Sequence, residues 1–411
     1  MIRVFYVFFI SLGLIFTVSG CSENKNDMDL TVFITPLCIA PSLQNGYGSE
    51  INQLAQPDDV ELLPDGSMIV SDVNNNRIQY FSPSGDFLRS ITASDLGLDE
   101  GQIIPTGLTK DDEGFIYITL EGVGRIARFK PDLTLDQYIG RPITVSAEEY
   151  YQPKNDGGLI KPQGIIAAAN GDLYVIDMAK NIFQEGEKRN FGFRKFKKVI
   201  KGNVVSYVYD DDFNRTQEIT KVMRKSEGMA ISEDQTTLYI AEEKPISKQF
   251  GNVNTMRYIA AFDLKSGRFQ DRLLGVTIEN DSITGGYFND SVEGLSVFGK
   301  YLIAVDEKAG KIYFFDIDSG ECRAFLGERA YFYCDDNSNC IIDGINYNEQ
   351  AIMAGVAMPH LKNDWRKNEL ASPDGLSAIV LVDGSSRMAV VDQWNSRVVV
   401  YDLGLVLQSI E

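Results

Sequence analysis

Six positions spread along the chain carry oxygen-bearing side chains at the same place in a recurring phrase, just before the glycine that five of its six copies carry. They are Asp58, Thr106, Gln163, Glu227, Glu293 and Asp374. Four of the six are carboxylates, and like charges brought within a few ångströms stay ionised only when a cation neutralises them. All six offer oxygen and none is His or Cys, a donor set that favours a hard cation such as Ca²⁺ over Zn²⁺. The alternative is a set of solvated carboxylates at the mouth of a wet channel.

The phrase that carries these residues consists of a polar residue, a glycine, an apolar pair, a polar turn and an apolar run closed by an acid. Its six copies are PDDVELLPDGSMIVSD from Pro57, PTGLTKDDEGFIYITLEG from Pro105, PQGIIAAANGDLYVID from Pro162, SEGMAISEDQTTLYIAEE from Ser226, VEGLSVFGKYLIAVDE from Val292 and PDGLSAIVLVDGSSRMAVVD from Pro373. Alternating strands separated by turn residues make each repeat a small antiparallel sheet of about four strands, which cannot bury its own faces. The sequence therefore predicts an all-β fold, a six-bladed β-propeller of four-stranded antiparallel blades around a central channel. A sandwich built from similar hairpins is the alternative.

In a propeller the first strand of every blade lines the channel, so the six positions are expected to converge on one axis. The last repeat reads as if residues 405–410 were its own fourth strand. The early strand at residues 30–36 is then either a partner that closes the ring or an extra edge.

A second series of acids closes the second apolar run of the repeats, at Asp72, Asp177, Glu242 and Asp392. These acids either add a further layer of oxygen ligands or cap the turns between strands, and capping is the favoured interpretation for Asp72 and Asp177. Glu242 and Glu243 differ, because two adjacent acids point to opposite sides and one of them faces inward or into a loop.

Basic residues stand directly before the fourth copy, at Lys221, Arg224 and Lys225, and are candidates for binding a phosphate substrate. A second basic cluster comprises Lys188, Arg189, Arg194, Lys195, Lys197 and Lys198. A solvated charged face is the alternative for that cluster. The chain has a single histidine, His360, which argues against a His-based metal site and a Ser-His-Asp triad.

The N-terminus has the parts of an export signal: Arg3, an uncharged stretch, and the lipobox-like VSGC that ends at Cys21. We expect residues 1–20 to be a lipoprotein signal peptide and residues 21–29 to be a lipidated Cys21 with a flexible tether, so that the protein is held at a bacterial cell envelope. Residues 30–411 form one propeller domain with insertions near 179–212 and 329–370. The net charge of -19 argues against a nucleic-acid partner, and we expect a monomer.

Four cysteines remain after Cys21, an even number that favours disulfides in an exported chain. Cys334 and Cys340 are the expected pair because the loop between them is short and rich in turn residues. Cys38 with Cys322 would follow by elimination.

The phrases VSDVNNNRIQYFSPSG and VVDQWNSRVVVYDL resemble NHL repeats and the propellers of the gluconolactonase family. More locally, at about residues 220–320, EGM with LYIAEE and VEGL with YLIA resemble the β-propeller phytases, calcium-dependent enzymes that release phosphate from inositol phosphates. That resemblance implies that calcium ligands lie at Glu227, Glu242 or Glu243, Glu293, Glu307 and Asp374. Ser291 stands where the phytases have an aspartate, and their asparagine-rich segment is absent.

Three hypotheses follow. The first is a lipid-anchored, calcium-dependent phosphomonoesterase that resembles the phytases and acts on a small phosphate ester, with Glu227 and Glu293 as candidate catalytic residues. The second is a non-catalytic NHL-type propeller that serves as a binding or scaffold module for an envelope partner. The third is a gluconolactonase-like hydrolase, which the absence of an asparagine from the six channel positions disfavours.

Overall fold

The structure is a computed structural model. It describes residues 31–32, 34–41, 48–99, 103–142, 157–178, 182–184, 187–189, 192–242, 257–279, 282–288, 291–329, 332–334, 339–342, 345–348, 369–370 and 372–411.

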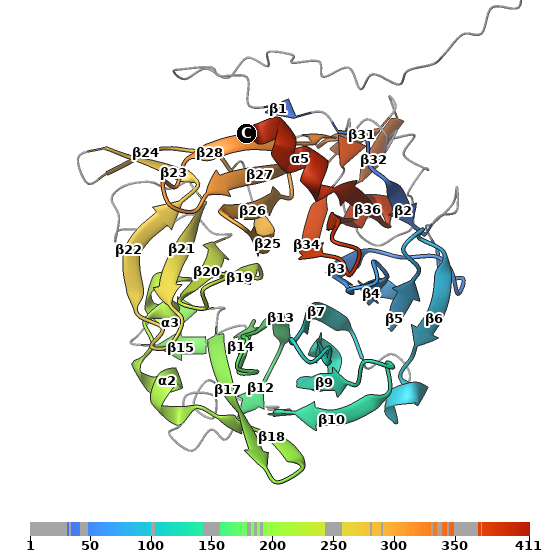
Figure 1. The fold of residues 1–411 in the computed structure, drawn as a ribbon, viewed down its shortest axis with the longest axis vertical. Helices are drawn as coiled ribbons and strands as arrows, with labels where there is room; N and C mark the ends of the chain where they lie inside the picture. The colour runs from blue at the N-terminus through green and yellow to red at the C-terminus, as the bar shows by residue number, and fades with distance from the viewer. Residues whose placement is uncertain are drawn as a thin grey trace, which may run out of the picture.

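Six four-stranded antiparallel sheets stand around a central axis and confirm the predicted six-bladed propeller (Figure 1). Blade 1 consists of β3 (Pro57–Leu62), β4 (Met68–Asp72), β5 (Arg77–Phe81) and β6 (Phe87–Ile91). Blade 2 consists of β7 (Pro105–Lys110), β8 (Ile116–Leu120), β9 (Arg125–Phe129) and β10 (Leu135–Ile139). Blade 3 consists of β13 (Pro162–Ala167), β14 (Leu173–Asp177), β17 (Gly192–Lys201) and β18 (Val204–Tyr209). Blade 4 consists of β19 (Met229–Ile231), β20 (Thr237–Glu242), β21 (Tyr258–Asp263) and β22 (Phe269–Leu274).

Blade 5 consists of β25 (Val292–Phe298), β26 (Tyr301–Asp306), β27 (Lys311–Asp316) and β28 (Cys322–Leu326). Blade 6 takes its inner three strands from the end of the chain and its outer strand from the beginning: β34 (Pro373–Val380), β35 (Ser386–Asp392), β36 (Arg397–Asp402) and β2 (Cys38–Ala40). The ring is therefore closed by β2, which pairs antiparallel with β36. Of the two possibilities for the early strand, β1 (Thr31–Val32) is an extra edge, since it pairs parallel with β28.

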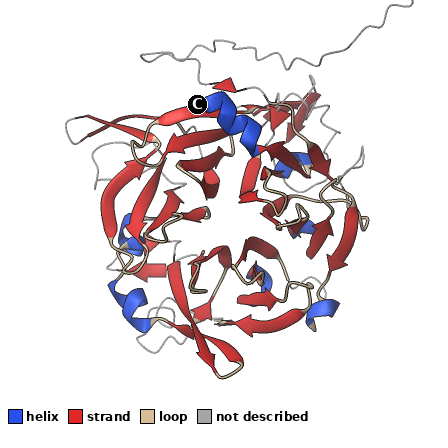
Figure 2. Ribbon diagram, in the orientation of Figure 1, coloured by secondary structure: helices blue, strands red, loops and turns tan. Residues whose placement is uncertain are grey.

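The prediction of a fourth strand at residues 405–410 is wrong, because this segment is the helix α5 (Leu403–Ile410). The Asp402 side chain accepts a hydrogen bond from the backbone N–H of Leu405 and so caps the helix. Leu403 and Val406 are buried against blades 5 and 6, with Leu407 and Ile410 packed beside them. Helices are few among the described residues (Figure 2); the others include α2 (Asp211–Thr216) and α3 (Ile219–Val222), which link blades 3 and 4.

The core lies between neighbouring blades. The second strands β4, β8 and β14 are buried along their whole length, because each is covered on both faces by the adjoining sheets. One apolar cluster, for example, joins Ile69 and Ile78 of blade 1 to Ile116 and Ile118 of blade 2. Each blade thus depends on its neighbours for burial.

The expected insertion at 179–212 is shorter than predicted, because residues 192–209 supply the two outer strands of blade 3. Before them comes a small hairpin of β15 (Ile182–Gln184) and β16 (Glu187–Arg189). The region 329–370 does add elements outside the blades. They are β29 (Glu328–Arg329), β30 (Phe332–Cys334), β31 (Asn339–Ile342), β32 (Ile345–Asn348) and β33 (Glu369–Leu370). The remaining short elements are β11 (Arg141–Pro142), β12 (Gly158–Leu159), β23 (Val276–Glu279) and β24 (Ser282–Gly286).

The expected disulfide between Cys38 and Cys322 is wrong. Both are free thiols, because Cys38 lies on the outer strand of blade 6 and Cys322 is buried in the outer strand of blade 5. The backbones of Cys334 and Cys340 do face one another across β30 and β31, but their side chains are outside the described part, as is Cys21. Within the described residues, no helix has the length and apolar character needed to cross a membrane.

Candidate functional site

A cavity of about 350 Å³ runs along the propeller axis, and the first strands of all six blades line it. Five of the six positions singled out in the sequence lie on its wall: Asp58, Gln163, Glu227, Glu293 and Asp374. The sixth, Thr106, is absent from the wall because its hydroxyl shares a hydrogen bond with Thr119 (2.9 Å) and also reaches the Pro162 carbonyl oxygen (3.1 Å). Blade 2 contributes Gly107 to the wall instead.

A repeated irregularity in the first strands directs these side chains at the axis. In blades 1, 2, 3, 5 and 6 the pairing of the first and second strands shifts register at this point, between Pro57 and Val60 in blade 1 and at the equivalent residues elsewhere. Such a bulge re-aims a side chain and often borders a functional site. The regular pairing of β19 begins only at Met229, just after Glu227 and Gly228.

The glycines that follow the ring positions allow the blades to approach one another. A Cβ on Gly228 would lie 2.1 Å from the carbonyl oxygen of Glu293 in the next blade, and Gly164 stands in the same relation to Glu227 at 2.2 Å. Only a residue without a Cβ fits so close to a neighbouring backbone. The glycines therefore set the spacing of the ring.

Blade 1 departs from this rule, since Asp59 occupies the place that glycine holds in the other blades. Its carboxylate accepts hydrogen bonds from the backbone N–H groups of Val60 (2.8 Å) and Leu108 (2.7 Å), and so joins blade 1 to blade 2. Burial is the main cause that raises the pKa of Asp59 to about 7, and these two hydrogen bonds partly oppose it. The sequence pattern gave no indication of this role.

The four axial carboxyl groups all have raised pKa values, for which burial is the largest cause. The pKa of Glu293 stands well above its usual value, and the charge of Glu227 raises it further. The pKa of Asp374 is likewise raised well above its usual value. After burial, the charges of Asp58 and Glu293 are the largest causes of this rise. Acids from four blades therefore act on one another across the axis.

Further polar side chains lie close to this ring. Each of them directly follows the last residue of the second strand of its blade. Glu121 accepts a hydrogen bond from Gln163 Nε2 (3.3 Å), and Gln393 Nε2 donates to Asp374 Oδ2 (2.6 Å). Glu307 accepts from the Ser372 hydroxyl (3.0 Å), and its charge raises the pKa of Glu227. The sequence predicted Glu307 as a site residue but not Glu121 or Gln393. These two hold the same place in their repeats as Glu307, and that equivalence could have identified them. Glu243 holds the same place in blade 4 but lies outside the described residues.

In blades 1, 3, 4 and 6 the acid that ends the second strand binds backbone N–H groups where the chain enters the blade. The buried Glu242 accepts hydrogen bonds from the backbone N–H groups of Arg224 (2.7 Å) and Lys225 (3.1 Å). Asp177 binds the N–H groups of Ile160 and Lys161 in the same way. Glu242 is not on the wall of the axial cavity. Its role therefore matches the capping that was favoured for Asp72 and Asp177.

Among the basic candidates, Lys225 lies next to a residue of the ring. Lys225 Nζ lies 3.8 Å from Glu227 Oε1, whereas Lys221 is exposed on α3. Lys195 and Lys197 pair with Asp210 in blade 3.

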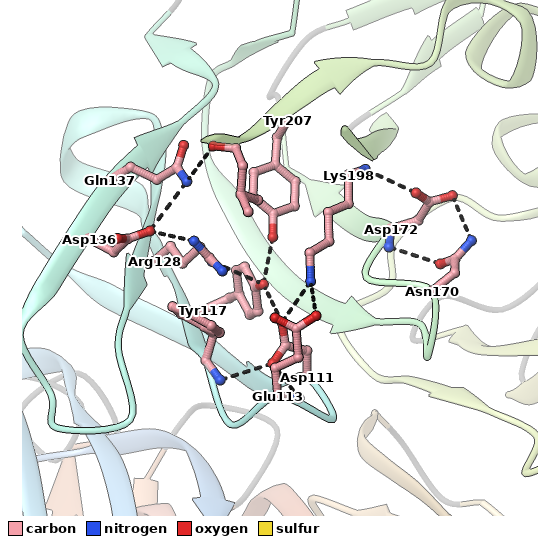
Figure 3. A network of polar contacts seen from close by, with 12 residues as sticks. Asp111, Glu113, Tyr117, Arg128, Asp136, Gln137, Asn170, Asp172, Lys198 and Tyr207 are labelled. Carbon is pink, nitrogen blue, oxygen red and sulfur yellow. Dashed lines mark hydrogen bonds and ion pairs between the residues drawn. The ribbon is translucent and has the colours of Figure 1, made fainter. Parts of the chain in front are cut away.

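Lys198 belongs to a polar network between blades 2 and 3, shown in Figure 3. It pairs there with Glu113 (2.8 Å) and Asp111 (3.7 Å). The Tyr117 hydroxyl donates to Asp111 (2.7 Å) and shares a hydrogen bond with Tyr207 (2.6 Å). These groups satisfy one another, so this part of the basic cluster holds two blades together.

The oxygen ligands of the ring suit a hard cation, although the carboxylates are not arranged as a complete coordination shell. In the described part of the chain no three His, Cys, Asp or Glu side chains are close enough together to hold a metal ion. Two buried oxygen acceptors on the cavity wall, Glu293 Oε2 and Gln163 Oε1, have no hydrogen-bond donor among the described residues. A buried acceptor left without a donor is costly. An ion here would have to draw the carboxylates inward or bind them through water.

The fold and the site together define a six-bladed propeller with an acidic axial cavity. The solved structures similar to this chain include a gluconolactonase from Xanthomonas campestris, with 13% identity, a TM-score of 0.45 and coverage of 84% of this chain and 86% of that one. They also include virginiamycin B lyase from Staphylococcus aureus, with 13% identity, a TM-score of 0.42 and coverage of 85% and 96%. At this identity the likeness concerns the fold alone. No family model and no curated protein matches the chain.

Proposed function

We propose that this protein is a propeller of the bacterial cell envelope that binds a hard cation, Ca²⁺, at the carboxylate ring on its axis. The ring residues are Asp58, Glu227, Glu293 and Asp374, with Glu307 beside them. The observation that carries the proposal is the buried Glu293 Oε2, an acceptor without a donor in a cavity walled by other acids. A cation would satisfy that oxygen and neutralise the mutual repulsion of the ring.

The anchoring part of the proposal rests on the N-terminal sequence, with Cys21 as the lipidated residue. A propeller held in this way would present its axial site at the membrane surface, for an envelope partner or a small ligand.

A phosphomonoesterase activity is the second candidate. It is favoured by the raised pKa values of Glu293 and Asp374, since carboxyl groups with strongly perturbed pKa values are typical of acid–base sites. When bound, Ca²⁺ would supply charge neutralisation and orientation of an anionic substrate. The chain's own part would be to hold or release a proton at Glu293 or Asp374. A lactonase is a weaker candidate, because the ring contains no asparagine.

The experiment compares the parent protein with the double variant Glu227→Gln/Glu293→Gln, in chelator and in excess Ca²⁺. Without the ion, the double variant should melt at the same or a higher temperature, because two mutually repelling acids are gone. With Ca²⁺ at about 100 times its Kd, the parent should gain about 2.7 kcal/mol of stability and the double variant little or none. The matched control is Asp318→Asn, which removes one exposed charge from the turn after β27.

Calorimetric titration then gives the affinity directly. The proposal would be refuted if Ca²⁺ neither changed the melting temperature of the parent protein nor produced heat of binding in the titration. Phosphate release from inositol hexakisphosphate, and opening of a sugar lactone, measured with and without Ca²⁺, decide between an enzyme and a binding module.

A further inference from the structure

The axial cavity has an apolar zone directly beyond its acidic ring. Two residues after each ring position the chain carries an aliphatic or thioether side chain: Val60, Leu108, Ile165, Met229, Leu295 and Leu376. The last five of these line the same cavity as the ring carboxylates, and together they are called the apolar belt. Each belt residue keeps 5–7% of its surface exposed, whereas Val60 is 1% exposed and lies off the wall. The belt is therefore the part of five inter-blade cores that faces the axis.

Strand geometry fixes the spacing between the ring and the belt. The belt residues lie on the first strands β7, β13, β19, β25 and β34, which surround the axis (Figure 1). Two residues of a strand span about 6–7 Å, and an extended alkyl chain covers that length with about five carbon–carbon bonds. A ligand with a charged group at the ring would thus reach the belt with a short alkyl chain.

The polar groups beyond the belt already satisfy one another. Glu61 and Lys110 form an ion pair between blades 1 and 2, and the Ser377 hydroxyl of blade 6 donates to Glu61 Oε1 (3.3 Å). The two wall acceptors that lack a donor among the described residues, Glu293 Oε2 and Gln163 Oε1, are both ring residues. The ring is therefore the end of the cavity that calls for hydrogen-bond donors.

A metal ion would account for the ring but not for the belt, because Ca²⁺ binds oxygen ligands and gains nothing from apolar walls. An apolar wall with a few converging polar groups is typical of a small-molecule site, and the cavity volume of about 350 Å³ falls within the range of such sites. A primary ammonium group offers a positive charge and three N–H donors. The chain itself brings one such group to the ring, since Lys225 Nζ lies 3.8 Å from Glu227 Oε1.

We propose that the axial cavity binds a linear primary alkylammonium ion, with its ammonium group at the ring and its alkyl chain along the apolar belt. The ammonium group donates to Glu293 Oε2, and the carboxylates of Glu227 and Asp374 add negative charge around it. The inference goes beyond the proposed function, because it uses the same ring but needs no Ca²⁺. The two cations compete for the ring.

The first test is a chain-length series in chelator, with ethyl-, butyl- and hexylammonium titrated calorimetrically into the parent protein. Each added CH₂ group that reaches the belt should tighten binding about fourfold. Hexanol and hexanoate are the controls for charge, and both should bind about tenfold or more weakly than hexylammonium. Equal affinities along the series, or hexanoate bound as tightly as hexylammonium, would overturn the proposal.

Two variants separate the ring from the belt. Glu293→Gln should weaken the binding of ethyl- and hexylammonium alike, by about tenfold, because the ring loses one negative charge. Met229→Gln has nearly the shape of the parent and should weaken hexylammonium binding about fourfold or more, while ethylammonium, too short to reach the belt, should bind as before. Asp318→Asn is the control and should change neither affinity. An unchanged ratio of the hexyl- to the ethylammonium affinity in Met229→Gln would refute the role of the belt.

Competition with Ca²⁺ keeps this inference apart from the proposed function. Hexylammonium at about ten times its Kd should raise the apparent Kd for Ca²⁺ about tenfold, because both cations need Glu293. Independent binding of the two cations would overturn the shared ring. A protein that binds Ca²⁺ but no alkylammonium would overturn the inference and leave the proposed function standing. A protein that binds hexylammonium but no Ca²⁺ would support the inference and refute the proposed function, and one that binds neither would refute both.

Discussion

The spacing of the ring depends on the glycines that follow its members, and Gly228→Ala tests this dependence most sharply. The added Cβ would lie 2.1 Å from the carbonyl oxygen of Glu293, 3.0 Å from its carbonyl carbon and 3.3 Å from Leu295 Cγ. Two of these three atoms belong to the backbone of β25, so the clash is relieved only if blades 4 and 5 move apart by about 1 Å. Overpacking of this kind costs about 1–3 kcal/mol. The same movement would displace Glu227 and Glu293, and we expect Ca²⁺ binding to weaken at least tenfold.

Urea unfolding in chelator gives the loss of stability, and calorimetric titration gives the loss of affinity. Gly404→Ala is the matched control, because Gly404 lies in α5 and its Cβ would meet only Asp402 Oδ1, at 3.3 Å. Alanine in a helix is favoured over glycine by about 0.5–1 kcal/mol, so this variant should be as stable as the parent or more stable. A Gly228→Ala protein within about 0.5 kcal/mol of the parent, with unchanged Ca²⁺ affinity, would refute the reasoning.

Three further predictions concern pH, the loop anchor and ring closure. The raised pKa of Asp59, about 7 against 3.8, means that the fold favours the protonated acid. The contribution of Asp59 to stability in chelator, about 4 kcal/mol, should be fully present below about pH 4 and be lost as the pH rises through about 7. Thermal melts from pH 4 to 8 check this, and a flat profile contradicts it. Glu242→Gln should lose about 1–3 kcal/mol in urea unfolding, because one of two backbone N–H groups loses its acceptor; a loss no larger than that of Asp318→Asn would contradict the anchoring role. Deletion of residues 1–41 removes β2 and exposes the edge of β36, so it should lower the melting temperature and promote self-association in light scattering. Deletion of residues 1–30 is its control, and equal behaviour of the two truncations would show that β2 does not close the ring.

The blades could be predicted from the sequence because each repeat carries the strand alternation and turn residues in the same order. Closure of the ring could not, because β2 is only three residues long and lies more than 300 residues from its partner β36. The segment 405–410 was assigned to a strand although Leu403, Val406, Leu407 and Ile410 follow the spacing of a helix. Asp402 also stands where a helix N-cap belongs. The helical period was the better guide there.

The axial positions could be predicted because a propeller places equivalent residues at equivalent distances from its axis. The direction of each side chain depends on local partners, which the repeat does not encode. Thr106 turns away because Thr119 and the Pro162 carbonyl bind its hydroxyl. Glu121 joins the site because Gln163 and Lys161 lie beside it. The pairing of Cys38 with Cys322 failed because it was argued by elimination rather than from geometry.

The most direct test of the central claim is a crystal structure of the protein with Ca²⁺ or Sr²⁺ bound, with the ion located by its anomalous signal. The proposed function predicts a peak on the propeller axis, with Glu293 Oε2 about 2.3–2.6 Å from a Ca²⁺ ion or joined to it through one bound water. Oxygens of Glu227 and Asp374 should share that ion or its waters. An axis without a peak, at an ion concentration that saturates any binding seen in solution, would contradict it.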